Sequence, residues 1–242
     1  MTVSHAKGFS LIELMVALLL GVVITLAATQ MFAGNSRAFN LQQAQSQVQE
    51  EGTLLMRFLA DDIRMAGLFG DDIAAQPGVV FAPITVGGKT LLGSGEGGSA
   101  GDSLTFTFVG DQDCLGNGAS STLIAQRYFL NNGGLYCDSS LAAAAIELLP
   151  NVEAFEVLYG IREGDETPPV ISRYVTANQV GDRPVMAVKL AVLLSKEAGL
   201  PASVGETVTY RLLDQSVTRA VDSRLRRAFQ RTVALRNFPW EA

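Results

Sequence analysis

Histidine and cysteine are scarce in this sequence, and their scarcity limits the chemistry that the chain supports. The single histidine, His5, lies ahead of a long apolar run. The rest of the chain therefore lacks a Ser-His-Asp triad, a histidine general base and the ligands of most zinc sites. No other group of residues supports catalysis, so we expect neither an enzyme nor a bound cofactor. The net charge of −6 also argues against a general nucleic-acid-binding chain.

Charge and proline are almost absent from the apolar run itself. Between Phe9 and Ala33 there is no proline, and Glu13 is the one charged residue. A helix of this length spans a hydrocarbon layer of about 30 Å. A charge inside such a span costs several kcal/mol, so it normally has a partner and marks a function. The alternative is a plain signal anchor in which Glu13 reaches toward the lipid headgroups.

The residues on either side of the run predict its orientation. The leader carries His5 and Lys7 and no acid, which places the N-terminus in the cytoplasm by the positive-inside rule. Everything after Asn35 is then extracytoplasmic, where disulfides persist. Both cysteines, Cys114 and Cys137, lie on that side and predict one disulfide; a pair of buried free thiols is the alternative.

The apolar run continues into an amphipathic helix, so it does not resemble a cleaved secretory signal. Apolar or small residues recur with a period of 3.6 and predict one helix from Phe9 to Gly67 that packs along one face. Gly67 is expected to close it. The packed stripe comprises Leu41, Ala44, Val48, Gly52, Leu55, Leu59, Ile63 and Ala66.

The stretch "KGFSLIELMVALLLG", residues 7–21, resembles the class III signal of type IV pilins and type II secretion pseudopilins. "FLADDIRMAGLFG" (58–70) and "FQRTVALRNF" (229–238) are similar to the PilW-type minor pilins. The resemblance implies that a prepilin peptidase cleaves between Gly8 and Phe9 and methylates the new amine. It also implies that Glu13 pairs with the N-terminal amine of a neighbouring subunit.

The remainder of the chain predicts a β-rich domain. Runs of β-branched and aromatic residues are bounded by glycine or asparagine, and residues 131–134, Asn-Asn-Gly-Gly, predict a hairpin turn. Residues 152–161 alternate as a half-buried strand does, and 184–195 suit a central strand. Residues 87–101 contain seven glycines and predict a loop without regular structure. The predicted strands are 79–86, 103–109, 122–130, 134–137, 152–161, 184–195 and 226–237.

The expected fold is therefore α+β, a long N-terminal helix packed on a β-rich globular domain as in type IV pilins. It divides into four parts: a leader (1–8), a transmembrane half of the helix (9–33), an amphipathic half (34–67) and an extracytoplasmic β-rich domain (68–242).

A calcium loop is conceivable at residues 111–122. Asp111, Asp113 and Gly116 stand at its first, third and sixth positions. Leu115 and Thr122 occupy two other ligand positions, however, and an ordinary turn is favoured.

Two other groups of residues have a functional and a plainer interpretation. The aspartate pairs 61–62 and 71–72 are interpreted as a solvated helix end and a loop rather than a metal site. The glycines of 87–101 are not followed by the Gly-Lys-Ser/Thr of a phosphate loop.

Arginines are concentrated near the C-terminus. DNA contact is one interpretation of this cluster; a charged edge strand that discourages aggregation or docks on acidic neighbours is favoured. The cluster consists of Arg224, Arg226, Arg227, Arg231 and Arg236.

The sequence thus predicts a non-enzymatic minor pilin, a subunit that primes assembly of the type IV pilus. We expect it to act in a complex at the filament tip. Expected partners are other minor pilins, the major pilin, the prepilin peptidase, the inner-membrane assembly platform and membrane lipid, whereas DNA is not expected. The protein is expected in the inner membrane with its domain in the periplasm, and after assembly in the extracellular pilus. The alternatives are a minor pseudopilin of type II secretion and a pilin-anchored adhesin or DNA-uptake module.

Overall fold

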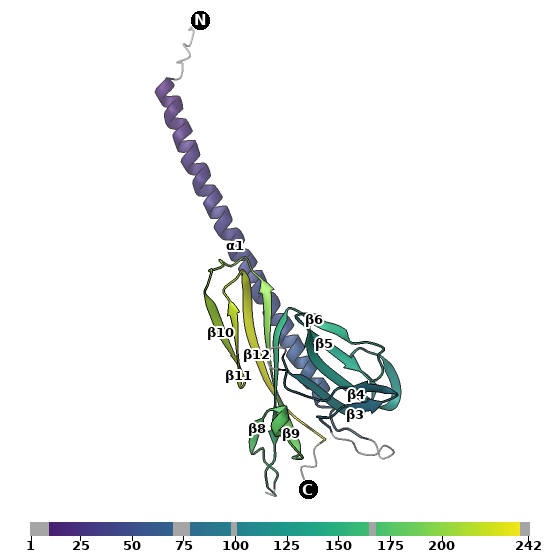
Figure 1. Cartoon of the computed structure of the whole chain (residues 1–242). Coiled ribbons are helices and arrows are strands. Elements are labelled where there is room, and N and C mark those ends of the chain that lie inside the picture. The colour runs from purple at the N-terminus through teal and green to yellow at the C-terminus, as the bar shows by residue number, and fades with distance from the viewer. Residues whose placement is uncertain (1–9, 70–77, 98–100, 165–167, 238–242) are drawn as a thin grey trace.

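Figure 1 shows the computed structural model, which describes residues 10–69, 78–97, 101–164 and 168–237. One long helix precedes a β-rich domain, as predicted. The elements are α1 (Leu11–Ile63), β1 (Ile84–Val86), β2 (Lys89–Leu91), β3 (Ser103–Gln112), β4 (Gly118–Asn131), β5 (Gly134–Ser139), β6 (Ile146–Pro150), β7 (Val152–Ile161), β8 (Arg173–Val175), the 3₁₀ helix η2 (Ala177–Gln179), β9 (Val185–Glu197), β10 (Thr207–Leu212), β11 (Gln215–Ala220) and β12 (Arg224–Ala234).

The second half of α1 packs on the domain through the predicted stripe. Met56 and Ala60 join its buried residues, while Leu41 at its start is only half-buried. The helix ends at Ile63, four residues before the predicted Gly67. Residues 64–67 form turns, and Gly67 has a φ of +77°, which suits a residue that ends a helical segment. The stripe residues buried here are Ala44, Val48, Gly52, Leu55, Leu59, Ile63 and Ala66.

Two four-stranded antiparallel sheets form most of the domain. Their strand orders are β3-β4-β5-β6 and β12-β9-β7-β8, and the pairs β1-β2 and β10-β11 form two further small sheets. The helix packs chiefly on β12 and β9 (Figure 1). The main core lies where the buried face of the helix meets side chains from both four-stranded sheets.

Every stretch predicted as a strand contains one, but five strands were missed: β2, β6, β8, β10 and β11. The prediction of a structureless loop at 87–101 was wrong for its first part. β2 lies there and pairs with β1 across Gly87 and Gly88, which both have positive φ values. Residues 98–100 of this stretch lie outside the described residues.

The prediction for β7 was wrong in one respect. Its sequence alternates, yet both faces of the strand are covered, and Glu156 is 3% exposed. β9 was predicted to be central, and it lies between β12 and β7.

The β4–β5 hairpin has the predicted turn. Asn131 pairs with Gly134, and the two residues between them have φ values of +47° and +77°, typical of a type I′ turn. A disulfide joins Cys137 on β5 to Cys114, which lies between β3 and β4, with a Cα–Cα distance of 6.6 Å.

Candidate assembly site

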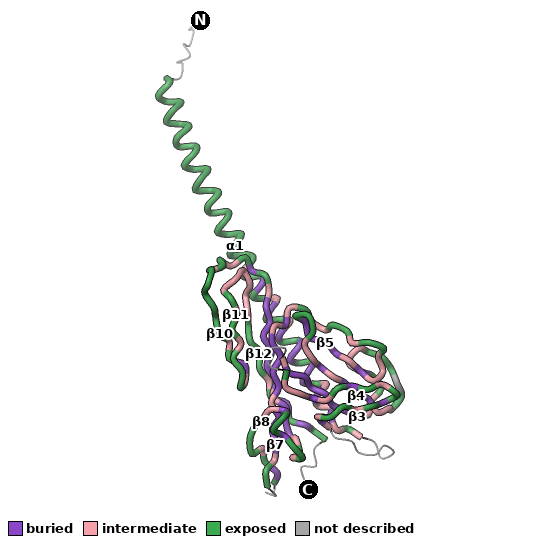
Figure 2. The backbone as a smooth tube through the Cα atoms, in the orientation of Figure 1, coloured by how far each residue is buried: buried purple, intermediate pink, exposed green. Residues whose placement is uncertain are grey.

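The first half of α1 projects from the domain (Figure 2). Every residue from Leu11 to Asn40 is exposed, as Figure 2 shows, and this part of the helix is apolar and long enough to cross a membrane. A soluble domain does not leave an apolar surface of this extent uncovered. The exposed half of α1 is therefore an apolar surface that the chain's own domain leaves uncovered.

Glu13 lies in the first turn of this exposed half. Its backbone N–H donates to the Ser10 hydroxyl (3.2 Å), which caps the helix. Among the described residues, no side chain pairs with the Glu13 carboxylate. The predicted cleavage residues Gly8 and Phe9 lie outside the described residues and directly precede this cap.

The other half of α1 is fixed to the domain by a close contact. Gly52 faces the ring of Phe229 on β12, and a Cβ atom at residue 52 would lie 2.3 Å from the ring. Glu51 next to it forms an ion pair with Lys196 near the end of β9 (2.7 Å). The helix and the β12-β9 edge of the sheet are thus in direct contact at a position where any larger residue would collide with the Phe229 ring.

Asp62 at the helix end was predicted to be solvated, and this prediction was wrong. Its carboxylate accepts hydrogen bonds from Tyr128 Oη and from Gln126 Nε2 (3.0 Å), both on β4. Burial raises the pKa of Asp62 to about 6, although these two hydrogen bonds act in the opposite direction. Gln126 in turn accepts the backbone N–H of Cys114, so the helix end is linked to the disulfide loop. Asp61 is exposed as predicted, and the pair 71–72 lies outside the described residues.

Asn237 caps the same end of α1 from the C-terminal segment. Its side-chain Nδ2 lies 3.2, 3.4 and 3.1 Å from the carbonyl oxygens of Arg64, Met65 and Ala66. These carbonyl groups lie in the turns that follow α1, where the helical hydrogen-bond pattern no longer supplies every donor. The sequence interpretation assigned this segment to a strand and to a resemblance, and missed its capping role.

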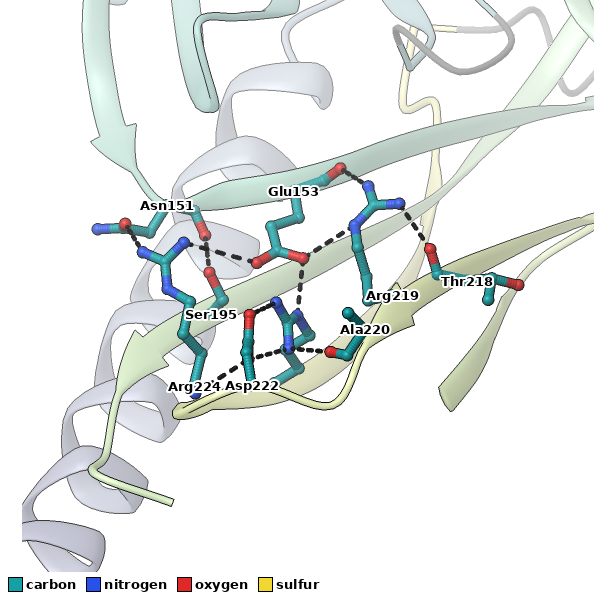
Figure 3. Close-up of polar contacts among 9 residues, drawn as sticks. Asn151, Glu153, Ser195, Thr218, Arg219, Ala220, Asp222 and Arg224 are labelled. Atoms are coloured by element: carbon teal, nitrogen blue, oxygen red, sulfur yellow. Dashed lines mark hydrogen bonds and ion pairs between the residues drawn. The ribbon is translucent and has the colours of Figure 1, made fainter. Parts of the chain in front are cut away.

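Two arginines of the cluster, Arg224 and Arg226, belong to a network around the largely buried carboxylate of Glu153, as Figure 3 shows. Glu153, whose side chain is 12% exposed, accepts from Arg219 Nε (3.0 Å) and Arg226 Nε (2.8 Å), and Arg224 lies 3.8 Å away. Asp222 binds Arg226 through both of its oxygens (2.7 Å each). Burial tends to raise the pKa of Glu153, but the hydrogen bonds from its arginines hold it below the usual value. The network joins the β10–β11 hairpin to β7 and β12.

β12 is an edge strand of its sheet, as predicted. Arg227 lies over the ring of Phe229 (5.8 Å), and Arg231 and Arg236 lie further along the strand and after it. Because Arg224 and Arg226 are neutralised within the fold, the arginine cluster gives less support to DNA contact than its sequence indicates.

Asp113, a candidate calcium ligand in the sequence, binds instead to donors of its own turn. Its carboxylate accepts from the backbone of Leu115 (2.9 Å) and from the backbone and side chain of Asn117 (2.8 and 2.9 Å). Burial tends to raise the pKa of Asp113, but these hydrogen bonds lower it below the usual value. In the described ranges, no group of three or more His, Cys, Asp or Glu residues is placed to hold a metal ion.

The chain matches two protein families. Residues 115–237, just over half of its length, match the type IV pilus-assembly protein W family. Residues 3–29 match the prokaryotic N-terminal methylation motif. None of the curated proteins compared with the chain matches it.

The solved structures that resemble the chain include the following two. The type IV-like pilin TTHA1219 from Thermus thermophilus is 21% identical, with a TM-score of 0.46; the match covers 78% of this chain and 96% of that one. A chain of the GspK-GspI-GspJ complex from the type 2 secretion system of enterotoxigenic Escherichia coli is 15% identical. Its TM-score is 0.31, and the match covers 73% of this chain and 92% of that one.

The long helix with an exposed first half, the methylation motif and the β-rich domain together define a type IV pilin-like protein, a minor pilin or pseudopilin. Within that class, the chain belongs to the type IV pilus-assembly protein W family.

Proposed function

We propose that this protein is a minor pilin that primes assembly of the type IV pilus, as part of a complex of minor pilins at the filament tip. The observation that carries the proposal is the uncovered apolar half of α1. In the membrane this surface contacts lipid, and in a filament it contacts the helices of other minor pilins and of the major pilin.

Processing and Glu13 make the exposed helix competent to assemble. The prepilin peptidase cleaves between Gly8 and Phe9 and methylates the new amine, which leaves a positive charge a few residues from Glu13. The carboxylate of one subunit then pairs with the amine of its neighbour as the assembly platform adds subunits. An ion pair in a low-dielectric environment is favourable only when both partners are present.

The proposed topology follows from the leader charge. The N-terminus is cytoplasmic, α1 crosses the inner membrane once and the domain lies in the periplasm. After assembly the domain is carried into the extracellular pilus. The disulfide suits an oxidising compartment.

A gene-deletion experiment separates this function from that of a type II secretion pseudopilin. The deletion strain is examined for surface pili in the sheared fraction and for secretion of a type II substrate, with the full chain supplied in trans as a control. We expect pili to be lost and secretion to remain. Lost secretion with normal pili would overturn the proposal in favour of a pseudopilin.

The position in the filament needs a separate measurement. The other minor pilins are tagged one at a time, and detergent-solubilised inner membranes are tested for co-purification with this chain. A tip complex predicts stable capture with other minor pilins, and immunogold labelling of pili should be confined to one end. Labelling along the whole filament would overturn the tip assignment.

A further inference from the structure

Asp102 connects the two four-stranded sheets. It directly precedes β3, and its backbone N–H donates to the carbonyl of Phe155 on β7 (2.8 Å). Its Oδ2 accepts the N–H of Val157 on the same strand (2.8 Å). β8 pairs with β7 only at residues 159–161, so Asp102 occupies part of the edge that β8 leaves open.

Glu156 lies between the two β7 residues that bind Asp102. Asp102 and Glu156 are both only 3% exposed, and each carboxyl group shifts the pKa of the other. Two ionised carboxylates have only acceptors, so a hydrogen bond can join these two groups only when one of them carries a proton. Since Asp102 already accepts from Val157 and Gly97, the donor is the carboxyl group of Glu156.

The other acids around this pair come from two further elements. Glu96 lies between β2 and β3 and accepts the N–H of Ala177 (2.7 Å), and Asp214 lies in the β10–β11 turn. Burial first, and then the negative charges of Asp102, Asp214 and Glu96, raise the pKa of Glu156 to about 8.

The nearest cations are engaged elsewhere. Lys189 on β9 is opposite Leu158, on the same face as Glu156, but its Nζ lies over the Tyr174 ring (5.6 Å). Arg219 on β11 lines the same cavity as Glu156 but is bound to Glu153. Neither cation is placed to replace the proton.

This cavity lies directly beside Glu156, one member of the pair. It has a volume of about 250 Å³ and lies between β7 and β11, with Glu156 in its wall. A small opening between these strands is therefore enough to expose the Glu156 carboxyl group to water.

We propose that Asp102 and Glu156 form a proton-dependent clamp in which one shared proton holds the start of β3 against β7. When the proton leaves Glu156 for water, two carboxylates face each other with no donor between them. Repulsion between them then opens the bonds from Asp102 to Phe155 and Val157, and the neighbouring β10–β11 turn with Asp214 loosens as well. The domain is more tightly closed in acidic medium than in alkaline medium.

Hydrogen exchange of the full chain in detergent micelles tests the clamp. The reporters are the amides of Asp102 and Val157, with exchange corrected for the intrinsic effect of pH. Because the closed clamp binds a proton that the open one releases, their protection should fall by up to about tenfold per pH unit between about pH 5 and pH 8. Above that range, where both forms are ionised, it should level off.

The variant Glu156→Gln separates the clamp from general effects of pH. A glutamine amide donates to Asp102 at every pH, so protection of the reporter amides should become independent of pH. Glu147→Gln, at an exposed glutamate on β6, is the matched control and should keep the wild-type dependence. If Glu156→Gln fails to fold, Asp102→Asn provides the same neutral donor from the other side.

Two results would overturn the proposal. One is wild-type protection at both amides that does not change with pH. The other is a folded Glu156→Gln or Asp102→Asn variant that keeps the wild-type dependence.

Discussion

The ring of Phe229 on β12 packs directly on Gly52 of α1, with no room for a Cβ atom between them. This contact sets the distance between the helix and the edge strand of the sheet. It also explains why a glycine, a poor helix former, lies within the buried stripe.

Gly52→Ala should therefore destabilise the protein. The alanine gains about 1 kcal/mol of helix propensity, but overpacking against Phe229 costs about 1–3 kcal/mol. We expect a net loss of about 1 kcal/mol in the free energy of unfolding, measured by denaturant titration of the full chain in detergent. Gly34→Ala, in open space on the same helix, is the control and should not destabilise. If Gly52→Ala matches Gly34→Ala, the contact does not limit the packing.

Replacing Asn237 tests the cap on the C-terminal end of α1. Asn237→Ala removes the amide donor from these carbonyl groups, although Met65 O keeps its bond from the Leu68 N–H, and should cost about 1 kcal/mol. Asn237→Asp should cost more, because a carboxylate offers no donor and faces the negative end of the helix dipole. Thermal unfolding of both variants checks this order, and an equal or smaller loss for Asn237→Asp would contradict the capping role.

The pH dependence of stability should include a contribution from Asp62. The folded state raises its pKa from 3.8 to about 6, so between these values the folded protein holds a proton that the unfolded chain releases. Stability from this group is fully present below about pH 4 and is lost as the pH rises through about 6, by an amount on the order of 3 kcal/mol.

Asp62→Asn checks this assignment, because an amide stays neutral and still accepts from Tyr128. The variant should be more stable than wild type above about pH 6, and the difference should shrink toward about pH 4. Urea unfolding of the two proteins across this range gives the measurement. A constant difference between them would show that Asp62 does not titrate at the junction.

The disulfide should carry a large share of the domain's stability. It closes a loop with a sequence separation of 23 residues, which is worth about 3 kcal/mol by loop entropy. The Cys114→Ser, Cys137→Ser double variant should unfold at correspondingly lower denaturant concentration. Alkylation of periplasmic wild-type protein without reductant should label neither cysteine, and labelling of both would exclude the bridge.

Glu13→Gln should leave membrane insertion and signal cleavage largely intact but impair incorporation into pili. In the single chain the carboxylate is exposed and unpaired among the described residues, so its loss removes nothing that the fold needs. In a filament the neighbour's amine would lose its partner, at a cost of about 3–5 kcal/mol.

Fractionation of membranes and sheared pili measures both effects of Glu13→Gln. Glu50→Gln, an exposed glutamate beyond the apolar run of the same helix, is the control and should assemble normally. Normal amounts of the Glu13→Gln variant in purified filaments would show that Glu13 is a headgroup anchor without a role in assembly.

Local sequence was a reliable guide where one residue's neighbours decide its structure. The 3.6 period predicted the buried stripe of α1 because side chains three and four apart share a helix face. The Asn-Gly turn of the β4–β5 hairpin was predictable because its two residues must adopt positive φ values.

The same local rules failed where a distant segment covers a residue. The alternation in β7 predicted a half-buried strand, because nothing in that stretch indicates that Asp102 and the β10–β11 hairpin cover the face that carries Glu156. Asp62 was assigned to solvent for the same reason, since its partner Tyr128 is 66 residues away.

The sequence by itself determined the apolar span, the single acid within it, the helix stripe and the two cysteines of the bridge. Each of these follows from composition or from spacings shorter than a few turns. The tertiary structure decided which charged and polar groups are buried, and with what partners. Glu153 is held by an arginine 73 residues away, and the end of α1 is capped from 171 residues away. Burying such a group costs free energy unless it has a hydrogen-bonding or charged partner. Only the folded chain brings together partners that are so distant in the sequence.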